Sequence, residues 1–442
     1  MPESGGIRSA DAANIGIGEE IRALIARLYP ICRSITGPGV RQTLEILSEI
    51  HPIRVSEVPT GTRVFDWTVP REWSIRDAYI KDSSGRRIVD FQAHNLHILN
   101  YSVPVEGRFT LAELKPHLHS LPDLPKAIPY RTSYYNDNWG FCLAHEQLQL
   151  LADEVYEVKI DSTLSNGSLS LGEIVLEGEV EDEILISTHT CHPSLANDNL
   201  SGMAVAIHLA KRMHERKRHH TYRFLFIPGT IGSITWLALN EANVHRIKHG
   251  LVITGVGDTG PLTYKRSRRG DAAIDRIAGH VLSAADEPHK IIDFYPYGYD
   301  ERQFCSPGFN LPVGRISRTP HGEYPEYHSS ADNPDFVSIP SLLRALDLIE
   351  AILLTADRDK MLVSRNPKCE PQLGKHGLYR KVAGQTGQQT DELALLWVLN
   401  LADGQHSLVE MAERAKLPFE RIVTAADALL AHGLLSDGRT RR

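Results

Sequence analysis

The amino-acid sequence predicts an α/β protein with a helix-covered sheet, a small β-rich insertion near the start and a helical module at the end. Between about residues 145 and 365, short apolar runs alternate with amphipathic segments, which is typical of buried strands packed between helices. Residues 52–144 contain shorter alternating runs separated by polar turns, a pattern that favours a small β domain. The 442 residues also exceed the usual length of one domain.

The order of elements follows from the spacing of apolar residues. Residues 19–50 have helical periodicity broken by Gly-Pro-Gly at 37–39, so two helices are expected there. Four apolar runs predict the central strands, and they read EILIST, YRFLFIP, HGLVITGV and LPVGRIS. We assign the chain to four parts: a main domain of 19–50 and 145–365, an inserted β domain of 52–144, a polar linker of 366–389, and three short helices in 390–442.

Composition excludes several classes of protein. A net charge of −7 and a pI near 6.3 argue against a general nucleic-acid or anionic-membrane binder. Five cysteines are odd in number and scattered, so we expect no disulfide framework and a reducing compartment. The sequence contains neither a signal-peptide pattern nor an apolar run of roughly 18 residues. These features predict a cytoplasmic protein without a membrane segment.

The segment ISTHTCHPSLANDNLSG (186–202) carries the strongest chemical signal. His189 follows a predicted buried strand, and the next loop supplies Cys191, His192 and Asp198. Ligands of open α/β sheets bind beyond the carboxyl ends of the strands, and histidine with carboxylate suits zinc. The alternative is a polar loop in which Asp198 caps the following helix.

Other predicted strands end in similar residues. Asp258 follows HGLVITGV, and the chain after LPVGRIS carries Glu326 and His328. The segment YGYDERQF adds three charged residues, Asp300, Glu301 and Arg302. A set of two histidines and two aspartates from separate strand ends fits a zinc ion with nitrogen and oxygen ligands and an open position. A turn at Asp258 and a purely structural His328 are the alternatives.

This arrangement resembles the co-catalytic zinc aminopeptidases, in which His189, Asp198, Asp258 and His328 match the metal ligands. Residues 20–440 are also similar to a little-characterised bacterial group of aminopeptidase-like proteins, often encoded beside sugar or natural-product biosynthesis genes. The motifs that carry this similarity are PICRSITG (30–37), VFDWTVPREWSIRDAYI (64–80), PYRTSYYNDNWGFC (129–142), CHPSLANDNLSG (191–202), YKRSRRG (264–270) and DERQF (300–304). The resemblance implies a zinc aminopeptidase-like α/β/α sandwich with one or two zinc ions, a lid-like β domain and a C-terminal winged helix.

The chain departs from the zinc aminopeptidases at two places. Cys191 stands where an aspartate usually orients the first histidine, so Cys191 and His192 are candidate supporting groups or additional ligands. Gly229 and Thr230 stand where the zinc aminopeptidases carry two glutamates, a general base and a metal ligand. We expect Glu326 to replace one of these acids, because it lies two residues before His328. Glu301 is its rival.

Other residues are candidates for binding substrate. Tyr134 and Trp139 lie in the aromatic segment of the expected lid, where the alternative is a small aromatic core. Arg268 belongs to a basic run that either binds an anionic group of the substrate or forms a solvated surface. Asp300 and Arg302 complete this set.

The C-terminal helices resemble a winged-helix module. Residues 391–442 contain eight acidic and six basic residues, which is a poor composition for contacting phosphates. We therefore expect docking or homo-oligomerisation rather than nucleic-acid binding, although a regulator that uses this module is a third, weaker hypothesis.

These observations predict a cytoplasmic zinc-dependent hydrolase of an amide or peptide-like bond. Its substrate would be a small molecule or short peptide-like compound, because a lid restricts access. The alternative is a non-catalytic binding protein on a peptidase fold, since the acid pair is missing at Gly229 and Thr230.

Overall fold

The computed structural model describes residues 5–378 and 392–437. The fold divides into two compact units. The first comprises the chain up to residue 275 together with 286–350, and the second comprises 276–285 and the chain from 351 onward. Among the described helices, none combines the length and the apolar character needed to cross a bilayer.

A mixed sheet forms the centre of the first unit. Its order is β1-β10-β12-β11-β13-β16-β14-β15 within the described residues. The four central strands β12, β11, β13 and β16 are mutually parallel, whereas β10 and β14 run antiparallel to their inner neighbours. The bounds of these strands are Arg54–Pro59 (β1), Ser168–Leu176 (β10), His220–Ile227 (β12), Val180–His189 (β11), Ile247–Ile253 (β13), Val313–Ser317 (β16), Leu262–Lys265 (β14) and His289–Ile292 (β15).

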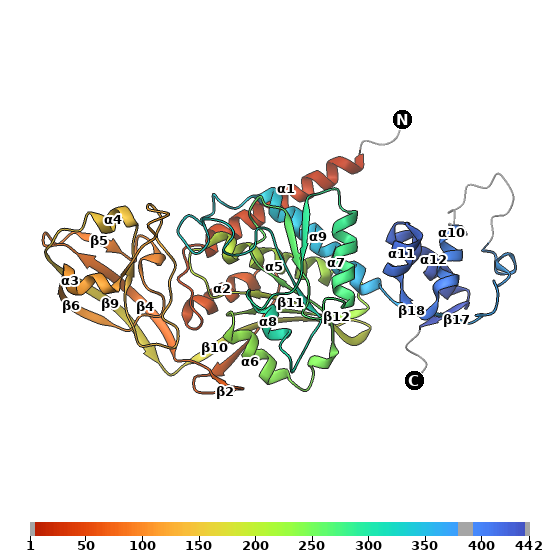
Figure 1. Cartoon of the computed structure of the whole chain (residues 1–442), viewed down its shortest axis with the longest axis horizontal. Coiled ribbons are helices and arrows are strands. Elements are labelled where there is room, and N and C mark those ends of the chain that lie inside the picture. Colours follow the sequence, from red (N-terminus) through yellow and green to blue (C-terminus); the bar gives the residue numbers. More distant parts are fainter. Residues whose placement is uncertain (1–4, 379–391, 438–442) are drawn as a thin grey trace. The chain divides into compact units, whose positions relative to one another are not determined.

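Helices cover both faces of this sheet (Figure 1), as the alternation of apolar runs predicts. Helix α5 packs against β10 to β13, and α2 and α6 pack against β10. Helix α2 begins at Pro38, within the Gly-Pro-Gly segment, because proline is well suited to the first turn of a helix. The helices of the first unit are α1 (Gly5–Leu28), α2 (Pro38–Ser48), α5 (Gly202–His214), α6 (Ile231–Asn240) and α8 (Glu301–Phe304). Helix α9 (Ile339–Arg358) runs from the first unit into the second, and most of α7 (Ala273–Ala284) belongs to the second.

The parallel strands bring the functional loops together. Because β11, β13 and β16 run in the same direction, the chain leaves all three at one edge of the sheet. The loops that follow them carry His189 to Asp198, Asp258, and His321 to His328, respectively. The fold thus concentrates the candidate residues at one edge.

The inserted β domain is built on a second sheet of order β5-β4-β9-β6. Its boundaries differ from the prediction at both ends. Arg54–Pro59 pairs with β10 of the main sheet, whereas Val155–Ser165 leaves the predicted main domain and forms the centre of the small sheet. The strands of this sheet are β4 (Glu72–Lys81), β5 (Arg87–Asp90), β6 (Val105–Thr110) and β9 (Val155–Ser165). The other elements of this part of the chain are β2 (Arg63–Val64), β3 (Trp67–Thr68), β7 (Leu118–His119), β8 (Phe141–Cys142), α3 (Leu111–Leu114) and α4 (His145–Gln149).

The C-terminal module contains the three predicted helices and, in its described part, a small antiparallel sheet of order β18-β17-β19. Its first strand, Met361–Ser364 (β17), lies inside the range predicted for the main domain, so the module begins earlier than expected. Ser407 and Glu410 form a capping box at the start of α11. The bounds are β17 (Met361–Ser364), α10 (Glu392–Leu401), β18 (Asp403–Ser407), α11 (Leu408–Ala415), α12 (Phe419–Ala431) and β19 (Leu435–Asp437).

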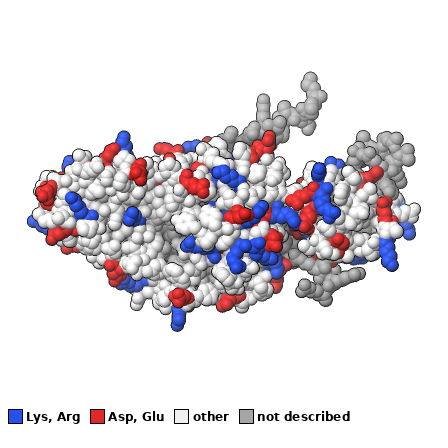
Figure 2. Space-filling view, in the orientation of Figure 1, with Lys and Arg blue, Asp and Glu red and all other residues white. Residues whose placement is uncertain are grey.

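The predicted linker of 366–389 is described only up to residue 378, and it includes a short helical turn at Leu373–His376. Its remainder lies outside the described residues. On the face drawn in Figure 2, acidic and basic side chains are interspersed over the described residues, without an extended field of one sign.

Candidate metal site

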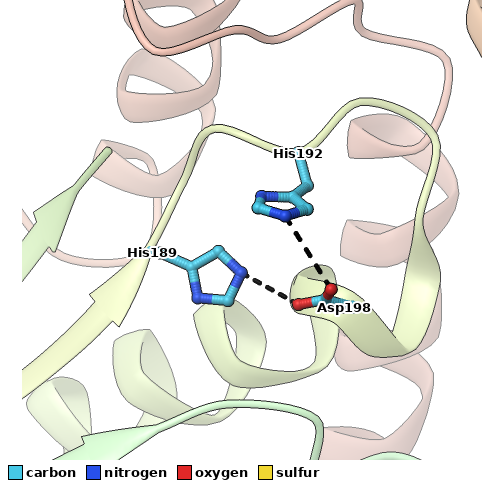
Figure 3. A group of neighbouring side chains, drawn as sticks. All are labelled: His189, His192 and Asp198. Atoms are coloured by element: carbon cyan, nitrogen blue, oxygen red, sulfur yellow. Dashed lines mark hydrogen bonds and ion pairs between the residues drawn. The ribbon is translucent and has the colours of Figure 1, made fainter. Parts of the chain in front are cut away.

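The carboxylate of Asp198 is the centre of the candidate site (Figure 3). Its Oδ1 lies 2.9 Å from Nε2 of His189. Its Oδ2 lies 3.0 Å from Nε2 of His328, which is not drawn in the figure. Nε2 of His192 is 3.8 Å from the same Oδ2. Each oxygen of this nearly fully buried carboxylate therefore faces imidazole nitrogen, and the four side chains come from two loops at the same edge of the sheet.

The loop that carries Asp198 is fixed by hydrogen bonds to a second loop. The backbone amides of Asn197 and Asp198 donate to the two oxygens of Asp332, at 2.6 and 2.9 Å. The side-chain Nδ2 of Asn199 donates to Oγ1 of Thr188 and to the carbonyl oxygen of His189. Asp332 lies four residues after His328, so these bonds hold His328 and Asp198 in a common frame.

The charges of the group suit a metal ion. Burial alone would raise the pKa of Asp198, but the neighbouring His192, His189 and His328 hold it well below the usual value. Burial lowers the pKa of His192 far below its usual value, so its ring stays neutral. An ionised carboxylate beside neutral imidazole is the state that binds a divalent cation.

Cys191 supports His192 rather than His189. Its Sγ lies 3.1 Å from Nδ1 of His192 and 3.6 Å from the carbonyl oxygen of Gly229. Burial raises the pKa of this thiol to about 12, so it stays protonated. If the thiol donates to the carbonyl, its sulfur accepts from Nδ1–H of His192 and leaves Nε2 as a lone pair directed to the site.

The geometry of the donor atoms fits a single ion. The ligand atoms of His189, His192 and Asp198 lie within 4.8 Å of one another, and this is the group of metal-ligand type found among the described residues. Although Nε2 of His328 is only 3.0 Å from Asp198, it makes no aligned hydrogen bond within the described structure. Close approach without alignment is expected where ligands converge on a common cation rather than on each other.

Tyr299 is a site residue that the sequence analysis missed. Its hydroxyl donates to Asp198 at 2.9 Å from Oδ1 and 3.0 Å from Oδ2, and it lies 3.3 Å from Nε2 of His192. Its ring stacks on His189 with centroids 4.0 Å apart. Burial, together with the charge of Asp198, raises the pKa of Tyr299 well above the usual value, so the hydroxyl remains a donor. Its position beside Asp300 in YGYDERQF was the available signal.

Asp258 does not join this group, in contrast to the expectation from the aminopeptidase motif. Its oxygens accept hydrogen bonds from the amide nitrogen of Gly260 (2.7 Å), from Oγ1 of Thr319 (2.8 Å) and from the side chain of Asn197 (3.2 Å). Asp258 therefore links the loop after β13 to the loops that flank it. The turn interpretation describes this residue better than the ligand interpretation.

The two predicted replacements for the missing acids are also not in the group. Glu301 is fully buried and lies 2.6 Å from Nζ of Lys265, while it accepts the backbone amide of Tyr299. The carboxylate of Glu301 is thus engaged by Lys265 and by the backbone of Tyr299. Glu326 is half-buried, and its carbonyl accepts bonds from Ser329. Its carboxylate does not belong to the metal-ligand group found in the described residues.

Asp300 lies where the missing acid would have been. A Cβ built on Gly229 would lie 3.5 and 3.6 Å from the two oxygens of Asp300, and 3.3 Å from Cβ of His189. Ser233 donates to Oδ1 at 2.8 Å, whereas the buried Oδ2 has no hydrogen-bond partner in the described part of the chain. Burial raises the pKa of Asp300 to about 6. The sequence analysis assigned this residue to substrate binding.

The aromatic segment divides between site and core. Tyr130 contacts the site, since its ring lies 5.0 Å from His192 and 5.1 Å from His328. The hydroxyl of Tyr134 bonds to that of Tyr130 at 2.9 Å, so Tyr134 supports a site residue. Trp139 instead stacks on His117 with centroids 3.6 Å apart, inside the inserted domain, and the core interpretation holds for it.

The two predicted arginines differ in exposure. Arg268 is exposed and donates to Asn310, which agrees with the solvated-surface alternative. Arg302 is half-buried and follows the Asp300–Glu301 pair at the start of α8. Neither arginine belongs to the group around Asp198.

Comparisons with known proteins agree with this architecture. Residues 22–359 match a family model described as a domain of unknown function, DUF4910, and residues 360–437 match a winged helix-turn-helix model. The chain is 49% identical over 418 residues to a putative polysaccharide biosynthesis protein with aminopeptidase-like domain from Clostridium acetobutylicum, covering 95% of this chain and 96% of that protein.

Two solved structures bear on the fold. A putative peptidase from Clostridium acetobutylicum superposes with a TM-score of 0.88 and 47% identity, over 98% of this chain and all of that one. BSAP, a zinc aminopeptidase from Bacillus subtilis, superposes with a TM-score of 0.56 and 14% identity, over 77% of this chain and 94% of that one. The aminopeptidase-like fold and the C-terminal winged helix predicted from the sequence are thus confirmed.

Proposed function

The chain belongs to the DUF4910 family, and we propose that it is a zinc-dependent hydrolase of an amide or peptide-like bond in a small substrate. The observation that carries this proposal is the convergence of three histidines on the two oxygens of the buried Asp198. Carbohydrate-linked substrates are favoured because a relative of 49% identity is named a putative polysaccharide biosynthesis protein.

The residues present fit zinc. His189, His192 and Asp198 would hold one ion, and His328 would approach it from the opposite loop. Zinc in such a site polarises a carbonyl group and lowers the pKa of water toward neutrality. The hydroxyl of Tyr299, which remains protonated, would donate a hydrogen bond to the oxygen of the reacting carbonyl group.

Asp300 is our candidate for the general base. When water adds to the carbonyl carbon, its proton would pass to Oδ2 of Asp300, and then to the leaving nitrogen as the C–N bond breaks. Support comes from the position of Asp300 beside Gly229 and from its pKa near 6, which suits a base that works at neutral pH. A carboxylic acid and an amine are the products.

The inserted domain would restrict access to the site. Pro129 bridges to Ser329, and the amide of Tyr130 donates to the carbonyl of His328 at 2.7 Å. These bonds place Tyr130 over the histidines, which favours small substrates. We further propose that the acidic C-terminal module serves docking or homo-oligomerisation.

The test combines metal analysis with hydrolysis. We expect the protein purified without chelators to contain about one zinc per chain, and to release product from a panel of aminoacyl-p-nitroanilides and N-acylated amino sugars. Asp198→Asn should lose both zinc and activity, because it removes the charge at the centre of the site. A protein without zinc, or an Asp198→Asn variant with full activity, would refute the proposal.

A binding protein on the same fold is the second candidate, and it is favoured by the absence of acids at Gly229 and Thr230. This candidate predicts no hydrolysis of any substrate in the panel, and absence of zinc after purification without chelators would favour it. It also predicts that Asp300→Asn leaves ligand affinity unchanged, since a binder needs no base.

A further inference from the structure

Two fully buried cations next to the metal group share one carboxylate. Lys265 on β14 and Arg315 on β16 stand directly opposite each other in an antiparallel pair, and both are 0% exposed. Like charges in directly opposed positions destabilise a sheet. Glu301 lies 2.6 Å from Nζ of Lys265 and 3.7 Å from Nη1 of Arg315. By formal charge, the three side chains sum to +1.

The lysine is satisfied and the arginine is not. Nζ of Lys265 bonds to the carbonyl oxygens of Tyr295 and Tyr297 at 2.9 and 3.0 Å, in addition to its ion pair. Nη1 of Arg315 donates to Nδ1 of His321 at 3.0 Å. Nε and Nη2 of Arg315, although buried, lack hydrogen-bond partners among the residues described. Lys265 and Glu301 therefore form the structural ion pair, and Arg315 carries the surplus charge.

His321, which accepts a hydrogen bond from Arg315, contributes a further hydrogen-bond donor. Because Nδ1 accepts from Arg315, the proton of the neutral ring is on Nε2, and burial lowers the pKa of His321 to about 4. That Nε2 is buried and also lacks a partner within the described structure. Nε and Nη2 form the edge of a guanidinium that matches the two oxygens of a carboxylate or phosphate.

This cluster lies directly behind the metal group. The ring of His321 is 5.8 Å from that of Tyr299 and 6.0 Å from that of Tyr327. Those two tyrosines stack on His189 at 4.0 Å and on His328 at 3.9 Å, respectively. One aromatic layer thus separates the donors from two of the imidazoles that face Asp198.

We propose that Arg315 and His321 form an oxyanion subsite that binds a carboxylate or phosphate group of the substrate. An anion at the Nε and Nη2 edge would balance the surplus charge and satisfy two donors of Arg315 that no residue of the described chain satisfies. The claim that the anion belongs to a substrate rests on the proposed hydrolase function, whereas binding of the anion does not. Arg268, the arginine predicted for this role, is exposed.

The test measures thermal stabilisation of the full chain by inorganic phosphate and by acetate, each against chloride at equal ionic strength. We expect a saturable rise of the melting temperature with phosphate, acetate or both, and an apparent Kd at least about 10-fold weaker in Arg315→Met, since a bidentate charged contact is lost. His321→Gln should weaken binding in the same direction. Arg266→Met is the matched control, because Arg266 is the neighbour of Lys265 in sequence and pairs with Asp293 at the surface.

Folding of the variant is itself informative. Replacing a buried and unbalanced cation by an apolar side chain is often neutral or stabilising, so Arg315→Met should melt at or above the wild-type temperature in chloride. Phosphate-only stabilisation identifies a phosphate-bearing ligand and acetate-only stabilisation a carboxylate-bearing ligand, and both support the subsite.

Equal stabilisation of wild type and Arg315→Met, or no stabilisation of the wild type, would overturn the proposal. These outcomes are independent of hydrolysis. If the protein binds phosphate through Arg315 but cleaves no substrate, the subsite proposal stands and the proposed hydrolase function fails. If the protein is an active enzyme that neither anion stabilises, the hydrolase function stands and the subsite proposal fails.

Discussion

Replacing Asp300 by asparagine separates the proposed proton transfer from every other role of this residue. Asparagine keeps the acceptor for Ser233 and nearly the same volume, but it cannot take a proton from water. We expect kcat to fall by about 10²- to 10⁴-fold, the usual range for removal of a general base. Zinc content should stay at the wild-type level, because the ligand atoms around Asp198 do not include Asp300.

The same substitution should stabilise the metal-free protein at neutral pH. Burial raises the pKa of Asp300 from about 3.9 in the unfolded chain to about 6. The folded state then binds more protons between these values, so the contribution of this group to stability is lost as the pH rises from about 4 to about 6. A shift of about two units corresponds to about 3 kcal/mol, which Asp300→Asn should recover at pH 8.

The assay is chemical denaturation of the metal-free proteins at pH 4 and pH 8, followed by intrinsic fluorescence, with exposed Asp271→Asn as the charge-matched control. The stability gain should be present at pH 8 and absent at pH 4. An Asp300→Asn enzyme with wild-type kcat would refute the role as base. A variant less stable than wild type at pH 8 would refute the reasoning from burial.

A paired substitution extends this test. Glutamate at position 229 would begin 3.5 Å from the oxygens of Asp300, so Gly229→Glu alone places two carboxylates in one buried space and should reduce activity. Combined with Asp300→Ser, it should regain part of that activity, because one acid then occupies the place of the other. Additive loss in the double variant would contradict the idea that the two positions serve the same space.

Two further predictions concern parts remote from the reaction. Trp139→Ala should destabilise the inserted domain by about 2 kcal/mol, because it removes a half-buried ring stacked on His117. The zinc content should be unchanged. Loss of zinc from a folded variant would contradict the assignment of Trp139 to the core. The second concerns Asp359, which accepts a hydrogen bond from the amide of Val409 and whose pKa burial raises to about 6. Asp359→Asn should remove the contribution of this group to the pH dependence of the stability of the C-terminal unit between about pH 4 and 6. The wild-type unit should lose about 3 kcal/mol of stability as the pH rises through this range, by the same conversion as for Asp300. Thermal melts at each pH measure this loss, and equal slopes in both proteins would count against the prediction.

The sequence predicts the fold well because strand burial and helix periodicity are local properties. The runs that form β11, β12, β13 and β16 are mostly apolar, which is typical of buried strands between amphipathic helices. The errors concern pairing partners. Val155–Ser165 alternates like a strand of either sheet, and only long-range contacts with β4 and β6 place it in the small one.

The candidate site shows the same difference between what local sequence predicts and what long-range contacts decide. His189 ends β11 and Asp198 lies in the loop that follows, so the sequence alone places them near each other, while hydrogen bonds to Asp332 fix the loop. Asp258 has the right residue type at the right strand end, but its oxygens are already used by Thr319 and Gly260, which the sequence does not reveal. Tyr299 was missed for the opposite reason, because its neighbours Asp300 and Glu301 carry charge and a tyrosine hydroxyl does not.

Buried charged residues without a matching counter-charge are the hardest to predict from the sequence. Lys265 and Arg315 lie in separate strands, and each alone is compatible with an ordinary surface cation. Only the register of β14 against β16, with Glu301 as the nearby acid, shows that one buried positive charge is left over. A fold that keeps an unbalanced buried cation gives up stability, and this loss is understandable where the missing anion arrives with a ligand. The metal group gives the same argument with the opposite sign, since Asp198 is a buried anion with a pKa held well below its usual value, and the imidazole of His192 beside it has a lowered pKa. A cation at Asp198 and an anion at Arg315, one aromatic layer apart, would together complete the charges of this edge of the sheet.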